Sequence, residues 1–193
     1  MKKFSLFTMF VCACVIMVGC GKKSTPVVVE PVIENGDTVA VNYTLTLANG
    51  EVKDTSFKDI AEKNSIVATG RTYEPLKFTL GQKQMIPGFE QGVLGMKAKE
   101  SKKITVSPDQ GYGTKNDKLV QSVSGSIFKD ANITPKVGDV FNFQFAPGKV
   151  LAISGDMIQI DFNHPLAGET LTFDVTIESI TKAVAATTGT MVK

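Results

Sequence analysis

The sequence predicts an α+β fold in which an antiparallel β-sheet packs on one short helix. Two observations carry this prediction. Several short segments alternate apolar and polar residues with period two, while one segment, residues 86–96, has apolar residues close to helical spacing. The 193 residues suffice for one domain or two small ones, and 42% hydrophobic with 21% charged residues is typical of a folded globular protein. Several short strands with one short helix favour this class.

The first expected strand is the clearest, because Val39, Val41, Tyr43, Leu45 and Leu47 alternate with other residues and give one apolar face. Asn49-Gly50 follows, and both residues tolerate positive φ, which predicts a hairpin with a second strand over 51–56. A helical turn near 59–63 comes next. Gly92 is unfavourable inside the helix expected at 86–96. Further strands are expected over 76–80, 102–106 and 171–177.

Residues 114–162 interrupt this pattern and predict a small β module with its own turns. Phe141, Phe143 and Phe145 alternate on one face, and two apolar segments follow, separated by Ser154-Gly155-Asp156. A module of about fifty residues has a marginal core, so it must borrow stability from its host or stay mobile.

Composition excludes several classes of site. The three cysteines are Cys12, Cys14 and Cys20, which excludes a disulfide framework, a zinc–cysteine site and a cysteine nucleophile in the folded part. A single His excludes a His-rich metal site, and we expect neither a metal nor another cofactor. Without Lys2 and Lys3, 19 basic residues balance 19 acidic ones, so there is no charge footprint for nucleic acid.

The N-terminus has the pattern of an export signal. Lys2 and Lys3 precede an apolar run over 4–18 that is too short for a membrane span. The run ends in Met17-Val18-Gly19-Cys20, which resembles a lipobox, so we expect removal of 1–19, lipidation of Cys20 and a tether through residue 35. A plain signal peptide and an uncleaved anchor are the alternatives. Each places the folded part outside the cytoplasm, and lipidation would hold it at the cell membrane, in the periplasm or on the outer surface.

Five motifs in order resemble those of FKBP-type peptidyl-prolyl cis-trans isomerases and cover about residues 36–180. They are Val41-Asn42-Tyr43-Thr44, Asn49-Gly50 with Asp54-Thr55-Ser56, the segment LGQKQMIPGFEQGVLGM from Leu80 to Met96, Pro108-Asp109-Gln110-Gly111-Tyr112-Gly113, and Leu171-Thr172-Phe173-Asp174-Val175. The resemblance implies an FKBP-like antiparallel sheet wrapped on one short helix.

The segment Asp161 to Gly168 (DFNHPLAG) is very similar to the SlyD-like subfamily, whose members carry a β-rich insert-in-flap chaperone domain at this point. This resemblance implies an isomerase domain at 36–113 and 163–183, an insert at 114–162 and a tail at 184–193.

Proline isomerisation makes and breaks no covalent bond, so it needs a dry apolar pocket and positioned donors rather than a nucleophile. By the resemblance, Phe89 is the pocket floor, the Ile86 backbone N–H and the Tyr112 hydroxyl are donors, and the remaining pocket positions are Tyr43, Asp54, Leu76, Met85 and Phe173. Taken alone, Phe89, Ile86 and Phe173 would be core residues in almost any β domain. Asp54 would be an acid at a strand end or turn, or an ion-pair partner of Arg71, and His164 would be a hydrogen-bonding loop residue.

The resulting hypothesis is a lipid-anchored monomeric isomerase with holdase activity, acting on unfolded or partly folded exported proteins that contain X-Pro bonds. Apolar residues of the insert, including Phe141, Phe143, Phe145, Ile153 and Met157, would bind these chains or form the insert's own core. An FKBP-like chaperone with little isomerase activity is the alternative, because Lys53 stands where many relatives have an apolar wall residue. A lipoprotein scaffold or a solute-binding protein is a third hypothesis, and the absence of a two-lobe pattern disfavours the solute-binding protein.

Overall fold

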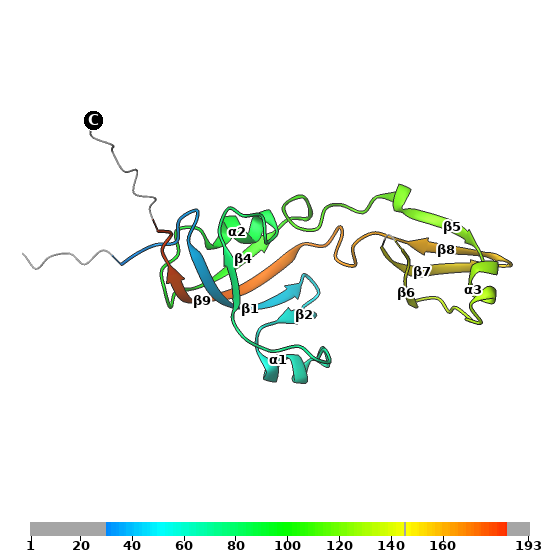
Figure 1. Ribbon diagram of the computed structural model, residues 1–193, viewed down its shortest axis with the longest axis horizontal. Helices are drawn as coiled ribbons and strands as arrows, with labels where there is room; N and C mark the ends of the chain where they lie inside the picture. The colour runs from blue at the N-terminus through cyan, green and yellow to red at the C-terminus, as the bar shows by residue number, and fades with distance from the viewer. Residues whose placement is uncertain (1–29, 145, 185–193) are drawn as a thin grey trace, which may run out of the picture.

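The computed structural model describes residues 30–144 and 146–184, which form two antiparallel sheets joined by two connecting segments (Figure 1). The first sheet contains β1 (Thr38–Leu47), β2 (Val52–Thr55), β3 (Leu76–Thr79), β4 (Ser101–Val106) and β9 (Leu171–Thr181). The strand order is β2-β1-β9-β4, with β3 also paired to β1. Two helices accompany this sheet, α1 (Lys58–Lys63) and α2 (Pro87–Val93), so the predicted α+β class is confirmed.

The central strand β1 follows its sequence pattern closely. Val39, Val41, Tyr43 and Leu45 are buried on the face that contacts α2, and Leu45 lies opposite Phe173 of β9. The predicted hairpin at Asn49-Gly50 is confirmed, since Gly50 has φ +84° and the Leu47 N–H donates to the Glu51 carbonyl at 2.9 Å. β9 extends to Thr181, beyond the predicted end at 177, because it pairs with β1 along the whole length of that strand.

Helix α2 is shorter than the 86–96 expected from the apolar spacing. Leu94 leaves the helical region with ψ 134°, and Gly95 follows with φ +79°. Gly92 lies directly on β4, where an added Cβ would overlap the side chain of Ile104, and a Cβ on Gly88 would overlap Val106 in the same way. The glycine that disfavours helix in the sequence is therefore what lets α2 approach the sheet closely.

The second sheet lies within the predicted segment 114–162. It has the order β5-β8-β7-β6, and its elements are β5 (Val120–Ser124), β6 (Val140–Asn142), β7 (Pro147–Ser154), β8 (Met157–Asp161) and the short helix α3 (Ser126–Asp130). Its small core consists of Phe128, Val150, Ile158, Ile160 and Phe162.

The β-rich module expected in this segment also contains a short helix, α3, which the sequence pattern did not indicate. α3 brings Phe128 into the core, and Phe128 packs against Phe141 with ring centroids 5.0 Å apart. β6 is also shorter than the alternation over 141–145 predicts, because Phe143 follows its last residue and Phe145 lies outside the described residues.

Two segments join the second sheet to the first, and hydrogen bonds hold them together. The Gly168 N–H donates to the Gly113 carbonyl at 2.8 Å. The Asn163 side chain accepts from the Asn116 N–H at 2.9 Å and donates to the Asn116 carbonyl at 3.1 Å. The segments before β5 and after β8 are therefore a hydrogen-bonded pair where they leave the first sheet. Figure 1 shows the course of both segments between the two sheets.

Asp37 fixes the point where both ends of the described chain meet. Its carboxylate is 1% exposed and accepts from the Glu34 N–H at 2.8 Å, the Ala183 N–H at 2.9 Å and the Lys182 Nζ at 2.8 Å. The Lys182 hydrogen bond, ahead of the two backbone bonds, holds the pKa of Asp37 below its usual value.

The predicted signal at 1–19, Cys20, most of the tether and the tail beyond Val184 lie outside the described residues. Among residues 30–144 and 146–184, no helix is long and apolar enough to span a membrane.

Candidate active site

An aromatic cluster fills the space between the first sheet and α2. Phe89 of α2 is fully buried, and its ring packs edge-on against Phe173 of β9 with centroids 4.9 Å apart. The Tyr43 ring lies 6.4 Å from Phe89, and the Phe78 ring lies 5.8 Å from it. The structure thus brings together the predicted floor residue Phe89 and two of its predicted neighbours, Tyr43 and Phe173.

Asp54 lies beside this cluster with its carboxylate fully engaged. The Tyr43 hydroxyl donates to Asp54 Oδ2 at 2.7 Å, and the Arg71 guanidinium forms an ion pair with Asp54 Oδ1. The Arg71–Asp54 pair considered from the sequence is therefore confirmed. Arg71 also donates to the Tyr43 hydroxyl and to the Thr55 carbonyl, each at 3.1 Å, and these two contacts were not predicted. They hold the segment between α1 and β3 over Tyr43.

The electrostatics of Tyr43 follow from this arrangement. Burial, and then the hydrogen bond and charge of Asp54, raise the pKa of Tyr43 to about 12. The hydroxyl therefore stays protonated at physiological pH and donates to Asp54. Burial and the charge of Asp54 also raise the pKa of Tyr112, so the Tyr112 hydroxyl shares the electrostatic environment of this carboxylate.

Two hydrogen-bond donors remain available at the site. Ile86 precedes α2, and its carbonyl accepts from the Phe89 and Glu90 N–H groups, but no described residue accepts from the Ile86 N–H. Tyr112 is 39% exposed, and its hydroxyl likewise has no hydrogen-bond partner among the described residues. An incoming carbonyl group is the natural partner for such donors.

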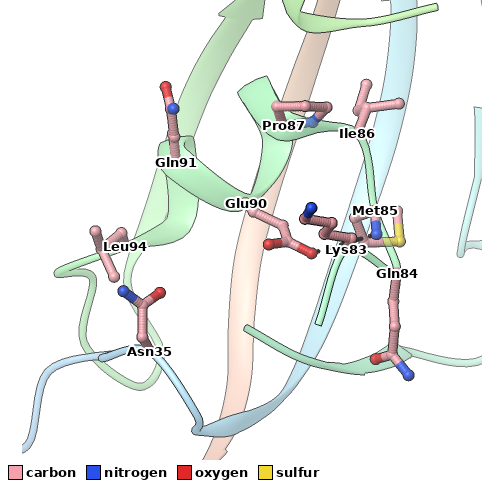
Figure 2. A pocket seen from close by; sticks show the side chains of 9 residues that line it. All are labelled: Asn35, Lys83, Gln84, Met85, Ile86, Pro87, Glu90, Gln91 and Leu94. Carbon is pink, nitrogen blue, oxygen red and sulfur yellow. Dashed lines mark hydrogen bonds between the residues drawn. The ribbon is translucent and has the colours of Figure 1, made fainter. Parts of the chain in front are cut away.

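Two hollows lie near the aromatic cluster and α2, and Ile86 lines one of them while Tyr112 lines neither. One, of about 360 Å³, borders the aromatic cluster and is lined by Tyr43, Arg71, Thr72, Glu74, Pro75, Leu76 and Lys77. The other, of about 850 Å³, lies against α2 and the loop before it, where Met85, Ile86 and Leu94 contribute its apolar wall. Figure 2 shows Glu90 extending from α2 toward this loop, where its carboxylate accepts from the Met85 N–H at 3.3 Å.

The smaller hollow marks the candidate active site, although its volume is less than half that of the other. Tyr43 and Leu76 line it, and Tyr43 continues into the buried rings of Phe89 and Phe173. Met85 and Ile86 pack partly against the same core while also lining the larger hollow. These two residues therefore connect the larger hollow with the core that contains Phe89.

Lys53 and the phenylalanines of the second sheet do not line the smaller hollow. Lys53 is exposed on β2 and forms an ion pair with Glu51, so its ammonium reaches water. Phe141 and Phe143 are half-buried against the core of the second sheet, which leaves each of them partly accessible. Their role in substrate binding stays a prediction.

The second sheet exposes more apolar side chains than the sequence analysis singled out. They are Ile127, Ile133, Val137, Val140, Leu151, Ile153 and Met157. Ile153 and Met157 are among the residues expected to bind clients or to form the insert's core, and both are exposed. The sequence analysis did not single out Ile127 or Ile133, because the first lies in the unpredicted helix α3 and the second in the loop after it. Among the described residues, no three His, Cys, Asp or Glu side chains are placed to hold a metal ion.

Comparison with known proteins gives the family of this chain. Residues 30–178 match the model of the FKBP-type peptidyl-prolyl cis-trans isomerase family. A short-type peptidyl-prolyl cis-trans isomerase of Methanocaldococcus jannaschii is 36% identical over 151 residues, which cover 78% of this chain and 96% of the relative. The FKBP-type 16 kDa isomerase of Escherichia coli is 31% identical over 159 residues, covering 80% and 97%. The isomerase SlyD of Aeromonas hydrophila is 32% identical over 151 residues, covering 76% and 64%. The chain belongs to the FKBP-type peptidyl-prolyl cis-trans isomerase family.

Proposed function

We propose that this protein isomerises X-Pro bonds in unfolded or partly folded exported proteins, and that it holds these clients with its second sheet at the cell envelope. The observation that carries the proposal is the combination of a buried aromatic floor with two unused donors. Phe89 and Phe173 supply the floor, and the Ile86 N–H and the Tyr112 hydroxyl supply the donors.

The proposed mechanism lowers the barrier without covalent chemistry. Rotation about the peptide bond is opposed by amide resonance, with a barrier of about 18–20 kcal/mol. The planar amide is more dipolar than the twisted one, so a dry floor at Phe89 disfavours the planar form relative to the twisted form. The Ile86 N–H and the Tyr112 hydroxyl then hold substrate carbonyl groups in place. Each 1.36 kcal/mol of selective stabilisation of the twisted amide corresponds to about a tenfold gain in rate.

Asp54 has a supporting role in this proposal. Its oxygens are already engaged by the Tyr43 hydroxyl, by Arg71 and by the Thr55 N–H at 2.8 Å. A carboxylate in this state acts through its fixed negative charge and through the Tyr43 ring that it anchors. It transfers no proton, and the isomerisation requires none.

The second sheet is the proposed client-binding region. Its exposed apolar side chains would contact unfolded segments, and its edge strands β5 and β6 could pair with them. Capture at this sheet raises the local concentration of client prolines at the pocket. The discontinuous division into an isomerase domain at 36–113 and 163–183 and an insert at 114–162 is part of the same proposal.

The client-binding role predicts a selective defect when exposed apolar residues are made polar. In the chain from residue 21 onward, the double change of Ile153→Ser and Met157→Ser is expected to leave isomerisation of a short Ala-Leu-Pro-Phe peptide within about twofold of the unchanged protein. It should slow the refolding of a proline-limited client protein several-fold, because the client is no longer captured. The matched control is Ser122→Ala on the exposed side of β5. An equal loss of rate in peptide isomerisation and in client refolding would show that the second sheet contributes to the isomerase pocket rather than to client capture.

The envelope location predicts a lipid-modified Cys20. Cells that express the full chain should incorporate labelled palmitate into the protein and retain it in the membrane fraction. Cys20→Ser should abolish both, while Cys14→Ser should abolish neither. Labelling that survives in Cys20→Ser would contradict the proposed anchor, whereas export without labelling would support a plain signal peptide.

A further inference from the structure

The Tyr112 ring is stacked on the His164 ring. The two rings are nearly parallel, at 7°, with centroids 3.8 Å apart. Tyr112 lies before the second sheet and His164 after it, so the contact joins the two connecting segments. Tyr112 stands between Gly111 and Gly113, so neither neighbouring residue has a side chain that could restrain the Tyr112 ring. Gly113 has φ +80°.

His164 is held more firmly than its partner. Its Nδ1 accepts from the Leu166 N–H at 3.1 Å, and its carbonyl accepts from the Ala167 N–H at 2.8 Å. The residue before it, Asn163, is bonded twice to Asn116 in the opposite segment. The His164 ring is therefore fixed from both sides along its own chain, and Tyr112 rests against it.

We propose that His164 is a positioning residue of the isomerase site, whose ring fixes the plane of Tyr112 and thereby the position of the Tyr112 hydroxyl. This inference rests on the proposed function, which assigns that hydroxyl to a substrate carbonyl. Without the stack, the exposed Tyr112 ring samples several rotamers and must be ordered when substrate binds. The cost of ordering one such side chain corresponds to a loss of roughly two- to tenfold in kcat/KM.

The hydrogen bond to Nδ1 also fixes the protonation state of His164. A nitrogen that accepts from a backbone N–H carries no proton, so the stacked ring is neutral. Burial lowers the pKa of His164 from its usual 6.5. Lys115, Lys149 and Asp161 line the hollow of about 370 Å³ that His164 borders. The folded protein thus binds this proton less readily than the unfolded one, so the neutral ring with its Leu166 hydrogen bond is complete above pH 6.5 and is lost as pH falls through the lower folded pKa.

The test compares two substitutions in the otherwise unchanged chain from residue 21 onward. His164→Ala removes the ring, while His164→Phe keeps a flat ring that neither titrates nor accepts from Leu166. For each protein, kcat/KM on a short X-Pro peptide is measured between pH 5 and pH 8, and the Tyr112 ring protons are followed by NMR. Tyr112→Phe assigns those signals and measures what the hydroxyl itself contributes.

The expected result is that His164→Ala moves the Tyr112 ring signals toward unstacked values and lowers kcat/KM roughly two- to tenfold. His164→Phe should keep the Tyr112 ring signals of the stacked form and the original kcat/KM. It should also abolish any decline of kcat/KM that the unchanged protein shows in acid, below pH 6.5. Unmoved Tyr112 signals in His164→Ala, or moved signals with full activity, would overturn the proposal. An equal loss in His164→Phe would overturn it too, since the Leu166 hydrogen bond would then be the important contact.

Failure of the proposed function gives a different pattern. In that case the unchanged protein does not accelerate exchange, or Tyr112→Phe matches the unchanged protein. The NMR comparison still decides whether His164 holds the Tyr112 ring.

Discussion

Replacing Phe89 by alanine is expected to abolish catalysis of X-Pro isomerisation and to lower the free energy of unfolding by about 3–5 kcal/mol. The Phe89 ring is fully buried and contacts the rings of Tyr43, Phe78 and Phe173. Its removal leaves a cavity under the proposed proline site, and the floor that keeps the site dry is lost. Urea unfolding gives the stability change, and a protease-coupled assay on a short peptide gives the rate.

Phe89→Leu and Phe57→Ala separate the two effects. Leucine keeps an apolar floor with a smaller cavity, so more stability and part of the activity should remain. Phe57 is 38% exposed, and its replacement by alanine should change the free energy of unfolding by no more than about 0.5 kcal/mol and leave the rate unchanged. A folded Phe89→Ala protein with the original rate would contradict the proposed site. If client refolding survived while peptide isomerisation disappeared, the chaperone alternative would gain support.

Local sequence signals predicted most of the first sheet. The alternation along β1 and the Asn49-Gly50 turn are properties of short segments, and the structure confirms both. Helix α2 could not be predicted in the same way from local sequence signals. Gly92 opposes a helix by intrinsic propensity, but it is required by the close approach to Ile104, a residue distant in the sequence. The length of α2 could therefore not be predicted from residues 86–96 alone.

The second sheet was harder to predict, because its elements depend on pairing. β5 has only two apolar residues, Val120 and Val123, and it is a strand because it pairs with β8. Helix α3 is too short for a helical pattern to show. Half-burial of Phe141 and Phe143 depends on Phe128, which arrives from that helix.

In the candidate site, too, some contacts could be predicted from the sequence and others could not. Family motifs place Tyr43, Phe89 and Phe173 in one region, and the structure brings these rings together. The contact of Arg71 with the Tyr43 hydroxyl and the stack of Tyr112 on His164 join segments with no local relation. Such contacts depend on how the connecting segments cross, which single-sequence patterns do not encode.

Asp37→Ala is expected to lower the free energy of unfolding by about 2–4 kcal/mol without affecting the isomerisation rate of the folded protein. The change removes the acceptor of the Glu34 and Ala183 N–H groups and one partner of Lys182. Asp37 lies roughly 20 Å from Tyr43 along the strand direction, at about 3.3 Å per residue, so the pocket should not sense its loss. Asp37→Ala should therefore lower stability while the folded protein keeps its activity, whereas Phe89→Ala should lose both.

The pH dependence provides a second measurement on Asp37. Its carboxyl binds a proton less readily in the folded protein, because Lys182 and two backbone N–H groups stabilise the charged form and lower its pKa. The stabilisation is therefore complete above the usual pKa of 3.8 and is lost as pH falls through the lower folded value. Asp37→Asn should flatten the dependence of the urea midpoint on pH below 4. The control is Asp174→Ala, which breaks an exposed ion pair with Lys103 and should cost less than about 1 kcal/mol. Equal effects of Asp37→Ala and Asp174→Ala would mean that the buried junction contributes no more than an ordinary surface pair.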